Sequence, residues 1–323
     1  MPLGSMCVTT GNDEGRVFLT ETELLQHNPA AANIRAYQYR PFDLRRINYV
    51  SAQLARSRRD VMEQFYQPNV GLLVLGQTRH TGAYDYAFLT ANVTDKNCLS
   101  TEANCSVFPL YRYLSPHTQA ALPGGIQPTR VGNVRDELLA ILTHAYGHPV
   151  TPEQVFYYTY AVLNAHGYLT EYEQQLRVEF PHIPFPRGAE RFAHMANLGS
   201  QLAEAHLGNH VPALQLPFNT TGNSVIEFAA VLHVPEQQAI QINPSGTTLG
   251  GVSTEMWEYT VGTRRPLRDW LEARNGRIFV LDYTEPQQQV LVNEFRAIAR
   301  RIAAALPLHQ QLDESWTDLL DAH

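Results

Sequence analysis

The sequence has almost no lysine and no long apolar run. Lys96 is the only lysine among 24 basic residues, and Asn97 follows it, so the chain has no G-x-x-x-x-G-K-[ST] phosphate loop. The apolar stretches at 70–75 and 228–234 are far shorter than the about 18–20 residues of a membrane-spanning helix. These absences exclude a P-loop nucleotide hydrolase and a transmembrane protein.

The common catalytic signatures are missing as well. The sequence has no G-x-S-x-G nucleophile elbow, no G-x-G-x-x-G fingerprint and no C-x-x-C pair. It contains neither the Asn-Pro-Pro-Tyr tetrapeptide of adenine methyltransferases nor the nuclease pattern of Pro-Asp followed by Glu-x-Lys. We therefore assign no catalytic residue and expect the chain not to turn over a substrate by itself.

Cysteine and histidine do not indicate a metal site. The three cysteines are an odd number without a signal peptide, and we expect reduced thiols in a cytoplasmic protein. His206 and His210 have the spacing that places two imidazoles on one helix face, which suits zinc. Gly208 is predicted to end the helix between them, and no third ligand is in reach, so we assign no metal.

Composition and charge indicate a folded protein with one basic segment. The 323 residues are 44% hydrophobic and 17% charged, and they suffice for about two structural lobes. Although the net charge is -7, residues 35–59 contain seven arginines and one acid, Asp43. The C-terminal tail is acidic instead, so we expect a polyanion to bind near the first segment.

The predicted fold class is α+β, with a strand-rich N-terminal lobe, a helical middle and a mixed strand and helix C-terminal lobe that ends in a long helix. The predicted strands lie at 70–75, 84–90, 106–114, 225–233 and 239–242, and the predicted helices at 133–142, 151–166, 169–180, 188–207 and 287–305. Residues 1–5 are expected to be the remnant of an affinity tag. The predicted divisions are 6–132 with the basic arginine cluster, 133–211, and 212–323.

The segment Tyr39-Arg40-Pro41-Phe42-Asp43-Leu44-Arg45-Arg46 places three guanidinium groups beside two aromatic rings. A guanidinium is a planar fork that fits phosphate oxygens or the O6 and N7 edge of guanine. The alternative is a structural role, in which Asp43 holds an arginine in a buried ion pair. The residues by themselves leave both interpretations open.

This segment resembles the YRPFDxR element in the C-terminal specificity region of Type ISP restriction–modification enzymes. Further blocks that resemble the family follow in order at 107–111, 151–163, 180–185 and 257–262, and the last is Pro266-Leu267-x-x-Trp270-Leu271-x-x-Arg274-x-Gly276-Arg277. The blocks extend over residues 37–277. Several also have a structural interpretation, and we expect Trp257, Tyr259, Trp270 and Leu271 to lie in the core.

The resemblance implies sequence-specific recognition of duplex DNA, which positions an adenine for N6 methylation and permits cleavage of unmethylated sites in defence against phage. Enzymes of the family join a nuclease, an ATP-driven translocase, a methyltransferase and a target recognition domain, and this chain resembles the last part alone. Its implied partners are duplex DNA and those other domains, with no membrane. No cofactor is implied for this chain, since S-adenosylmethionine, ATP and Mg2+ serve the parent enzyme. Leu169 and His182 stand where relatives have arginine, so no phosphate contact is expected there.

Arginine-rich positions supply the candidate DNA contacts. The expected phosphate contacts are Arg40, Arg45, Arg46, Arg58 and Arg59. The expected base-reading residues are Gln77, Arg79, His80, Arg264 and Arg265, and Arg79 has Asp85 as a possible internal partner. Two other hypotheses stay open: a self-contained hydrolase or nuclease with an unrecognised motif, and a protein-interaction module that docks on a methyltransferase without contacting DNA.

Overall fold

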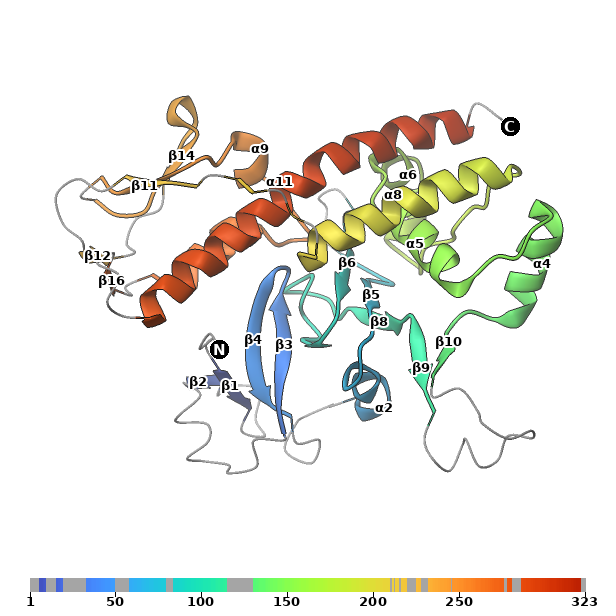
Figure 1. Ribbon diagram of the computed structural model, residues 1–323, viewed down its shortest axis with the longest axis horizontal. Helices are drawn as coiled ribbons and strands as arrows, with labels where there is room; N and C mark the ends of the chain where they lie inside the picture. The colour runs from blue at the N-terminus through green and yellow to red at the C-terminus, as the bar shows by residue number, and fades with distance from the viewer. Residues whose placement is uncertain are drawn as a thin grey trace.

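The computed structural model describes residues 6–9, 16–19, 33–49, 58–79, 84–114, 130–209, 211, 213–214, 216–219, 225–227, 232–244, 246–275, 278–280 and 286–320. The expected tag remnant at 1–5 lies outside them. The fold is α+β, as predicted. Two long helices, α8 (Ala189–Leu207) and α11 (Pro286–Leu320), run side by side, with the strand-rich N-terminal part packed below them in Figure 1.

Strands dominate the N-terminal part of the chain. A five-stranded sheet has the order β2 (Arg16–Leu19), β1 (Met6–Thr9), β4 (Asp43–Asn48), β3 (Ile34–Arg40) and β7 (Val93–Thr94), in which β3 and β4 form an antiparallel hairpin. A second sheet has the order β6 (Ala87–Thr90), β5 (Gly71–Val74) and β8 (Ser106–Pro109). Between the hairpin and β5 lie α2 (Arg59–Met62) and η3 (Glu63–Phe65). The strands predicted at 70–75, 84–90 and 106–114 are confirmed, the last as two pieces.

The middle of the chain is helical, as predicted. After the ribbon of β9 (Tyr111–Tyr113) and β10 (Arg130–Gly132) come α4 (Asp136–Tyr146), α5 (Pro152–Val162), α6 (His166–Glu171), α7 (Glu173–Leu176) and α8. Helix α5 starts at a capping box, in which the Thr151 hydroxyl accepts a hydrogen bond from Gln154 N and the Gln154 side chain accepts one from Thr151 N. Helix α4 begins later than the predicted residue 133, with Arg135 at its N-cap. The Asn133 side chain donates to the Pro109 carbonyl at 2.9 Å.

The continuous helix predicted over 169–180 is wrong. The chain leaves helical geometry at Tyr172, where φ is -105° and ψ is 16°, which separates α6 from α7. Leu169 and Leu176 are buried, but Val178 and Phe180 beyond them are exposed. The apolar pattern therefore does not continue on one face, and tertiary packing ends the helix before its prolines are reached.

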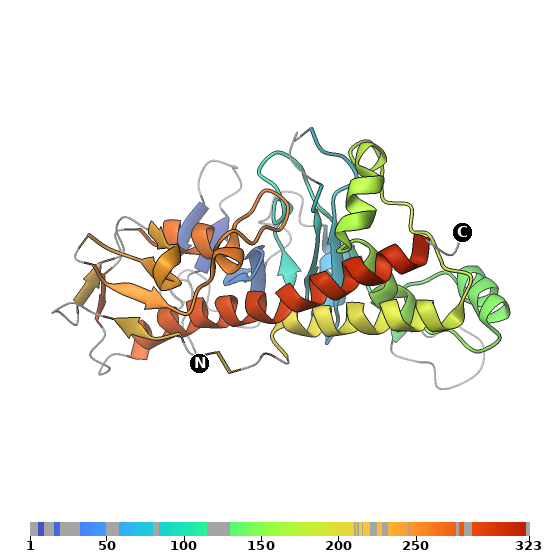
Figure 2. The same ribbon diagram turned by 90° about the horizontal axis from the view of Figure 1, so that it is seen from above.

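Small sheets and helices form the described C-terminal part of the chain. Strands β11 (Phe218–Asn219), β15 (Thr248–Gly250), β14 (Ala239–Gln241) and β13 (Leu232–Val234) make one sheet, with η4 (Pro235–Gln237) between β13 and β14, and β12 (Val225–Glu227) pairs with β16 (Ile278–Val280). Helices α9 (Thr254–Trp257) and α10 (Pro266–Glu272) precede α11. Figure 2 shows α11 extending along most of the molecule. It is longer than the predicted 287–305.

The extension of α11 results from packing near its C-terminal end. The helix continues through Pro307, which lies on an exposed position, because Leu312 and Trp316 beyond it are buried. The Trp316 ring meets Tyr168 of α6 edge to face at 5.3 Å. This contact joins the end of the chain to its helical middle, at sequence distances that periodicity cannot detect.

One large buried cluster contains residues from all three predicted divisions, including Leu73, Tyr158 and Trp270. As expected, Trp257, Trp270 and Leu271 are core residues, and Tyr259 is partly buried against them. The divisions at 132 and 211 stay a prediction. Among the described residues, no helix is both long enough and apolar enough to cross a membrane.

Candidate nucleic-acid interface

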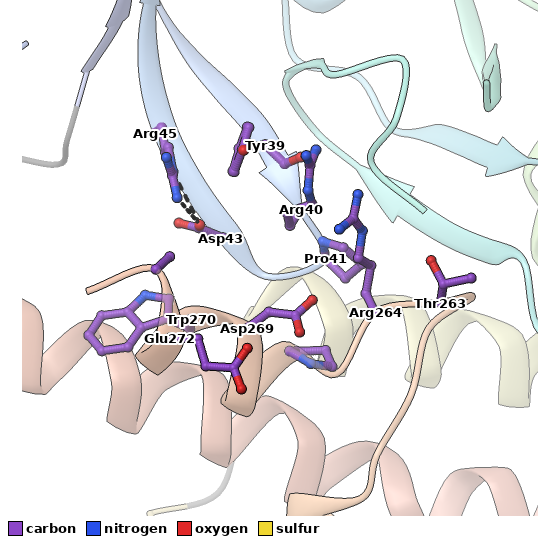
Figure 3. A pocket seen from close by; sticks show the side chains of 12 residues that line it. Tyr39, Arg40, Pro41, Asp43, Arg45, Thr263, Arg264, Asp269, Trp270 and Glu272 are labelled. Carbon is purple, nitrogen blue, oxygen red and sulfur yellow. Dashed lines mark hydrogen bonds and ion pairs between the residues drawn. The ribbon is translucent and has the colours of Figure 1, made fainter. Parts of the chain in front are cut away.

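A pocket of about 330 Å³ lies between the tip of the β3–β4 hairpin, the turn at 261–265 and α10 (Figure 3). Three segments that are far apart in the sequence supply its walls. The lining residues are Tyr39, Arg40, Pro41, Asp43, Arg45, Thr263, Arg264, Pro266, Asp269, Trp270, Glu272 and Ala273. The pocket therefore contains both arginine donors and carboxylate acceptors.

Phe42 fixes the position of the hairpin tip. Its φ of 62° is in the left-handed region, which is unfavourable for a bulky residue. The side chain is only 4% exposed, and its ring meets Phe88 at 4.9 Å and His206 at 5.4 Å, both edge to face. Burial of this ring offsets the backbone strain and anchors the tip beneath α8.

The hairpin arginines have different surroundings. The Tyr39 ring lies close to both Arg40 and Arg45, each with its guanidinium carbon 3.9 Å from the ring centroid. Arg45 is 6% exposed and forms a 2.8 Å ion pair with Asp43, so it has the structural role that the sequence left open. An expected phosphate contact by Arg45 would require an exposed guanidinium, which this burial does not provide. Arg40 is more exposed, and it donates to the Tyr39 carbonyl at 2.7 Å and lies 3.6 Å from Asp95.

Asp43 also connects the hairpin to α10. Its Oδ1 lies 3.4 Å from Nη2 of Arg274, which stacks on Trp270 at 3.8 Å and donates to the Trp270 carbonyl at 3.1 Å. Glu294 of α11 lies 3.7 Å from the same guanidinium, and burial raises the pKa of Glu294 to about 7 against the opposing charge of Arg274. The family-like blocks at 39–46 and 266–277 are thus in contact, although Asp43 and Arg274 are 231 residues apart in the sequence. This contact joins two walls of the pocket.

The turn at 261–265 is fastened to the N-terminal part of the chain. Gly262 has a φ of 62°, and a Cβ there would lie 2.3 Å from the Leu99 carbonyl oxygen, so the position requires glycine. Thr263 N donates to that carbonyl at 3.1 Å, and Arg264 Nη2 donates to the Asn97 carbonyl at 3.0 Å. These bonds hold the backbone of the turn and orient Arg264.

The structure brings Arg264 and Arg40 to the same pocket, although they were predicted for different tasks. Burial and the nearby charge of Arg40 lower the pKa of Arg264. Arg265, the next predicted base-reading residue, is exposed, is not among the lining residues of the pocket and lies 3.6 Å from Glu258. Sequence reasoning missed Asp269, which lies across the pocket from Arg40 and Arg264 on α10, because an isolated aspartate in a helix carries no signal (Figure 3).

The remaining expected phosphate contacts lie elsewhere. Arg46 on β4 is half-buried and lines a separate pocket of about 310 Å³ beside α11. Arg58 and Arg59 are exposed at the start of α2, and Arg59 forms an ion pair with Glu63 one helical turn on. Helix α2 lies at the open end of the hairpin in Figure 1, away from the tip. The five predicted residues therefore do not form one surface.

Gln77 and Arg79 are exposed on a loop after β5, and His80 lies outside the described residues. Thr78 N between them donates to the Arg177 carbonyl at 3.1 Å, and a Cβ at Gly76 would lie 2.8 Å from the Phe180 ring. The backbone of this loop is thus held while its polar side chains face outward.

Asp85 is not the partner of Arg79. The Thr260 hydroxyl donates to the Asp85 carboxylate at 3.4 Å, and burial raises the pKa of this carboxyl to about 8. Within the part of the chain that the structure describes, Arg79 forms no ion pair.

His206 belongs to a buried hydrogen-bond chain between the long helices. Its Nδ1 pairs with the Tyr160 hydroxyl at 2.5 Å and its Nε2 with the Tyr259 hydroxyl at 2.9 Å, and Tyr259 continues to His309 Nε2 at 2.9 Å. Burial lowers the pKa of both histidines, so the network favours neutral rings. Gly208 ends α8 as predicted, with a φ of 82°, and His210 lies outside the described residues. No group of three potential metal ligands occurs among the described residues.

The family model of the Type ISP C-terminal specificity domain matches residues 15–296. The chain belongs to this family, which confirms the resemblance that the sequence blocks suggested. No curated protein matches the chain.

Three solved structures have similar folds. They are the ATP-dependent Type ISP restriction-modification enzyme LlaBIII bound to DNA (TM-score 0.65, 17% identity), the DrdV–DNA complex (0.67, 20%), and a nuclease-deletion mutant of the Type ISP enzyme LlaGI in complex with a DNA substrate mimic (0.60, 15%). The matches cover 87%, 88% and 86% of this chain but only 18%, 28% and 20% of those chains. The chain thus spans less than a third of the length of the proteins it resembles.

Proposed function

We propose that the chain recognises a specific sequence in duplex DNA, as the target recognition domain of a Type ISP restriction–modification enzyme. The observation that carries this proposal is the family match over residues 15–296. All three similar structures contain DNA or a DNA mimic. Adenine methylation, ATP-driven translocation and cleavage are assigned to other domains of a longer polypeptide, together with S-adenosylmethionine, ATP and Mg2+.

Four arginines on α2 and the β3–β4 hairpin are proposed as phosphate contacts. Arg58 and Arg59 lie at the surface of α2, and Arg46 is half-buried on β4. Contacts to phosphates fix the register of a protein on DNA without reading its sequence. Arg40 is proposed to serve the same purpose from the hairpin tip, where its stacking on Tyr39 restricts the guanidinium.

Two separate sites are proposed to read bases. The first is the loop with Gln77, Arg79 and His80, whose two described side chains are exposed on an anchored backbone. The second is Arg264 in the pocket together with the exposed Arg265 that follows it, both on the turn at 261–265, whose backbone is bonded to Leu99. Two separate base-reading sites can specify base pairs at more than one position of the recognition sequence.

The test is selection of bound duplexes from a random pool by the purified chain, followed by titration of the selected duplex and a scrambled one. Tighter binding of the selected duplex supports the proposal, and equal binding would contradict it. The same preparation is incubated with DNA, Mg2+, ATP and S-adenosylmethionine. We expect neither cleavage nor methyl transfer, whereas turnover by the purified chain would favour the hydrolase hypothesis.

A further inference from the structure

Asp269 stands out among the acids of the pocket because no described arginine forms an ion pair with it. Asp43 pairs with Arg45 and Arg274, and Glu272 accepts a hydrogen bond from Arg268 Nε at 2.7 Å. Asp269 forms no ion pair anywhere in the described part of the chain. A carboxylate in this position is available to accept hydrogen bonds from a ligand.

Asp269 is also half-buried rather than free in solvent. Burial raises the pKa of this carboxyl, and the charges of Arg264 and Arg40 and a hydrogen bond from the Arg265 backbone oppose the shift. In Figure 3 the carboxylate projects from α10 toward the space below Arg40 and Arg264. The Asp269 carboxylate and the two arginines therefore face the same pocket without forming an ion pair with each other.

Arg264 keeps donors for a ligand despite its internal bond. A guanidinium has five N–H groups in a fixed fork. Nη2 uses one of them on the Asn97 carbonyl, and Nε is buried without a partner among the described atoms. The N–H groups of Nη1 and the second N–H of Nη2 remain for a bidentate contact.

A donor fork beside an acceptor matches one base pair in the major groove. Guanine presents two neighbouring acceptors, N7 and O6, and its paired cytosine presents the N4 amino donor next to them. An A·T pair instead places its donor between two acceptors. Two neighbouring guanidinium donors followed by a carboxylate acceptor therefore cannot all form hydrogen bonds with an A·T pair. A phosphate fits less well between Arg264 and Asp269, because the carboxylate would repel it.

We propose that Arg264 and Asp269 together read a G·C base pair, with Arg264 donating to O6 and N7 of guanine and Asp269 accepting from N4 of the paired cytosine. This inference rests on the proposed function and adds the identity of one recognised pair. The site is preorganised, because the turn that carries Arg264 is bonded to Leu99 and α10 is joined to the hairpin by Asp43 and Arg274. Little conformational freedom is lost when DNA binds to such a site.

The test compares Asp269→Asn with the wild type in a position-by-position binding profile of the selected duplex. Asparagine keeps the size of the side chain but replaces one acceptor oxygen by a donor. We expect the preference for G·C to fall about five- to one-hundred-and-fiftyfold at one position, with little change at the others. The dependence of affinity on salt should stay unchanged, because no phosphate contact is removed.

Two further variants keep the test independent of folding. Glu314→Gln is the matched control, and it should leave the profile unchanged because Glu314 accepts a hydrogen bond from Gln310 on α11 and does not line the pocket. Asp269→Glu keeps the carboxylate and should retain more of the G·C preference than Asp269→Asn. Melting temperatures of all variants are measured on the same samples.

Four outcomes would overturn the inference while sequence-specific binding stands. They are an unchanged profile in Asp269→Asn, an equal loss of affinity at every position, an equal loss in Asp269→Asn and Asp269→Glu, and a wild-type profile with no position that specifies G·C. A wild type that binds all duplexes equally would instead refute the proposed function itself, and the inference with it.

Discussion

Replacing Asp43 by asparagine removes the negative charge that balances two buried guanidinium groups. The side chains of Asp43, Arg45 and Arg274 are 7%, 6% and 4% exposed, so none of the three is well solvated. Removing one partner from a buried ion pair costs about 3–5 kcal/mol, because the other charge stays buried without compensation. Glu294 remains 3.7 Å from Arg274, and we therefore expect a loss near the lower limit, about 3 kcal/mol.

Urea denaturation of the two proteins measures this loss directly, and thermal unfolding gives a second measure. A chain of 323 residues should lose about 1.5 °C of melting temperature for each kcal/mol. Glu63→Gln is the control, because the Arg59–Glu63 pair is exposed and such pairs contribute about 0–1 kcal/mol. If Asp43→Asn were no more destabilised than Glu63→Gln, the view of Asp43 as the charge that joins hairpin and α10 would be refuted.

Three more outcomes follow from the described side chains. Arg58→Ala combined with Arg59→Ala should weaken binding to all duplexes alike. It should also reduce the slope of log binding constant against log salt concentration by up to about two. An unchanged slope would show that neither arginine contacts a phosphate. Arg79→Ala should keep its melting temperature and lose about 1–3 kcal/mol of discrimination at one base pair, and an unaltered binding profile would contradict this. Asp85 has a folded-state pKa of about 8, above the about 3.9 of an unfolded chain, so its contribution to stability falls as pH rises through this range. Asp85→Asn should therefore gain stability relative to the wild type as the pH rises from about 4 to about 8 in urea titrations, and an equal change in the stability of both proteins over this range would exclude the effect.

Local signals in the sequence predicted those elements whose ends are set by neighbouring residues. The capping box at Thr151 and the left-handed Gly208 defined helix ends because each acts within one turn of the chain. The end of α11 could not be predicted, since it depends on burial of Trp316 against Tyr168. The break at Tyr172 was missed for the same reason, because tertiary packing decides it.

The candidate site was predictable in residue type but not in arrangement. The sequence marked Arg40 and Arg264 separately, yet only the fold places them in one pocket. It offered two roles for the arginines near Asp43, and burial determines that Arg45 takes the structural one.

The distribution of the pocket walls along the chain constrains how such a domain can be recombined. The hairpin tip ends near residue 45, and the turn with α10 begins near residue 261. A chimera that takes its first half from one relative and its second half from another would join a hairpin and a helix that were selected in different proteins. Asp43 would then face a foreign residue in place of Arg274, and the pocket would combine unrelated walls. New specificities should therefore arise more readily by exchanging both wall segments together, or by single substitutions inside the pocket, than by a crossover through the helical middle.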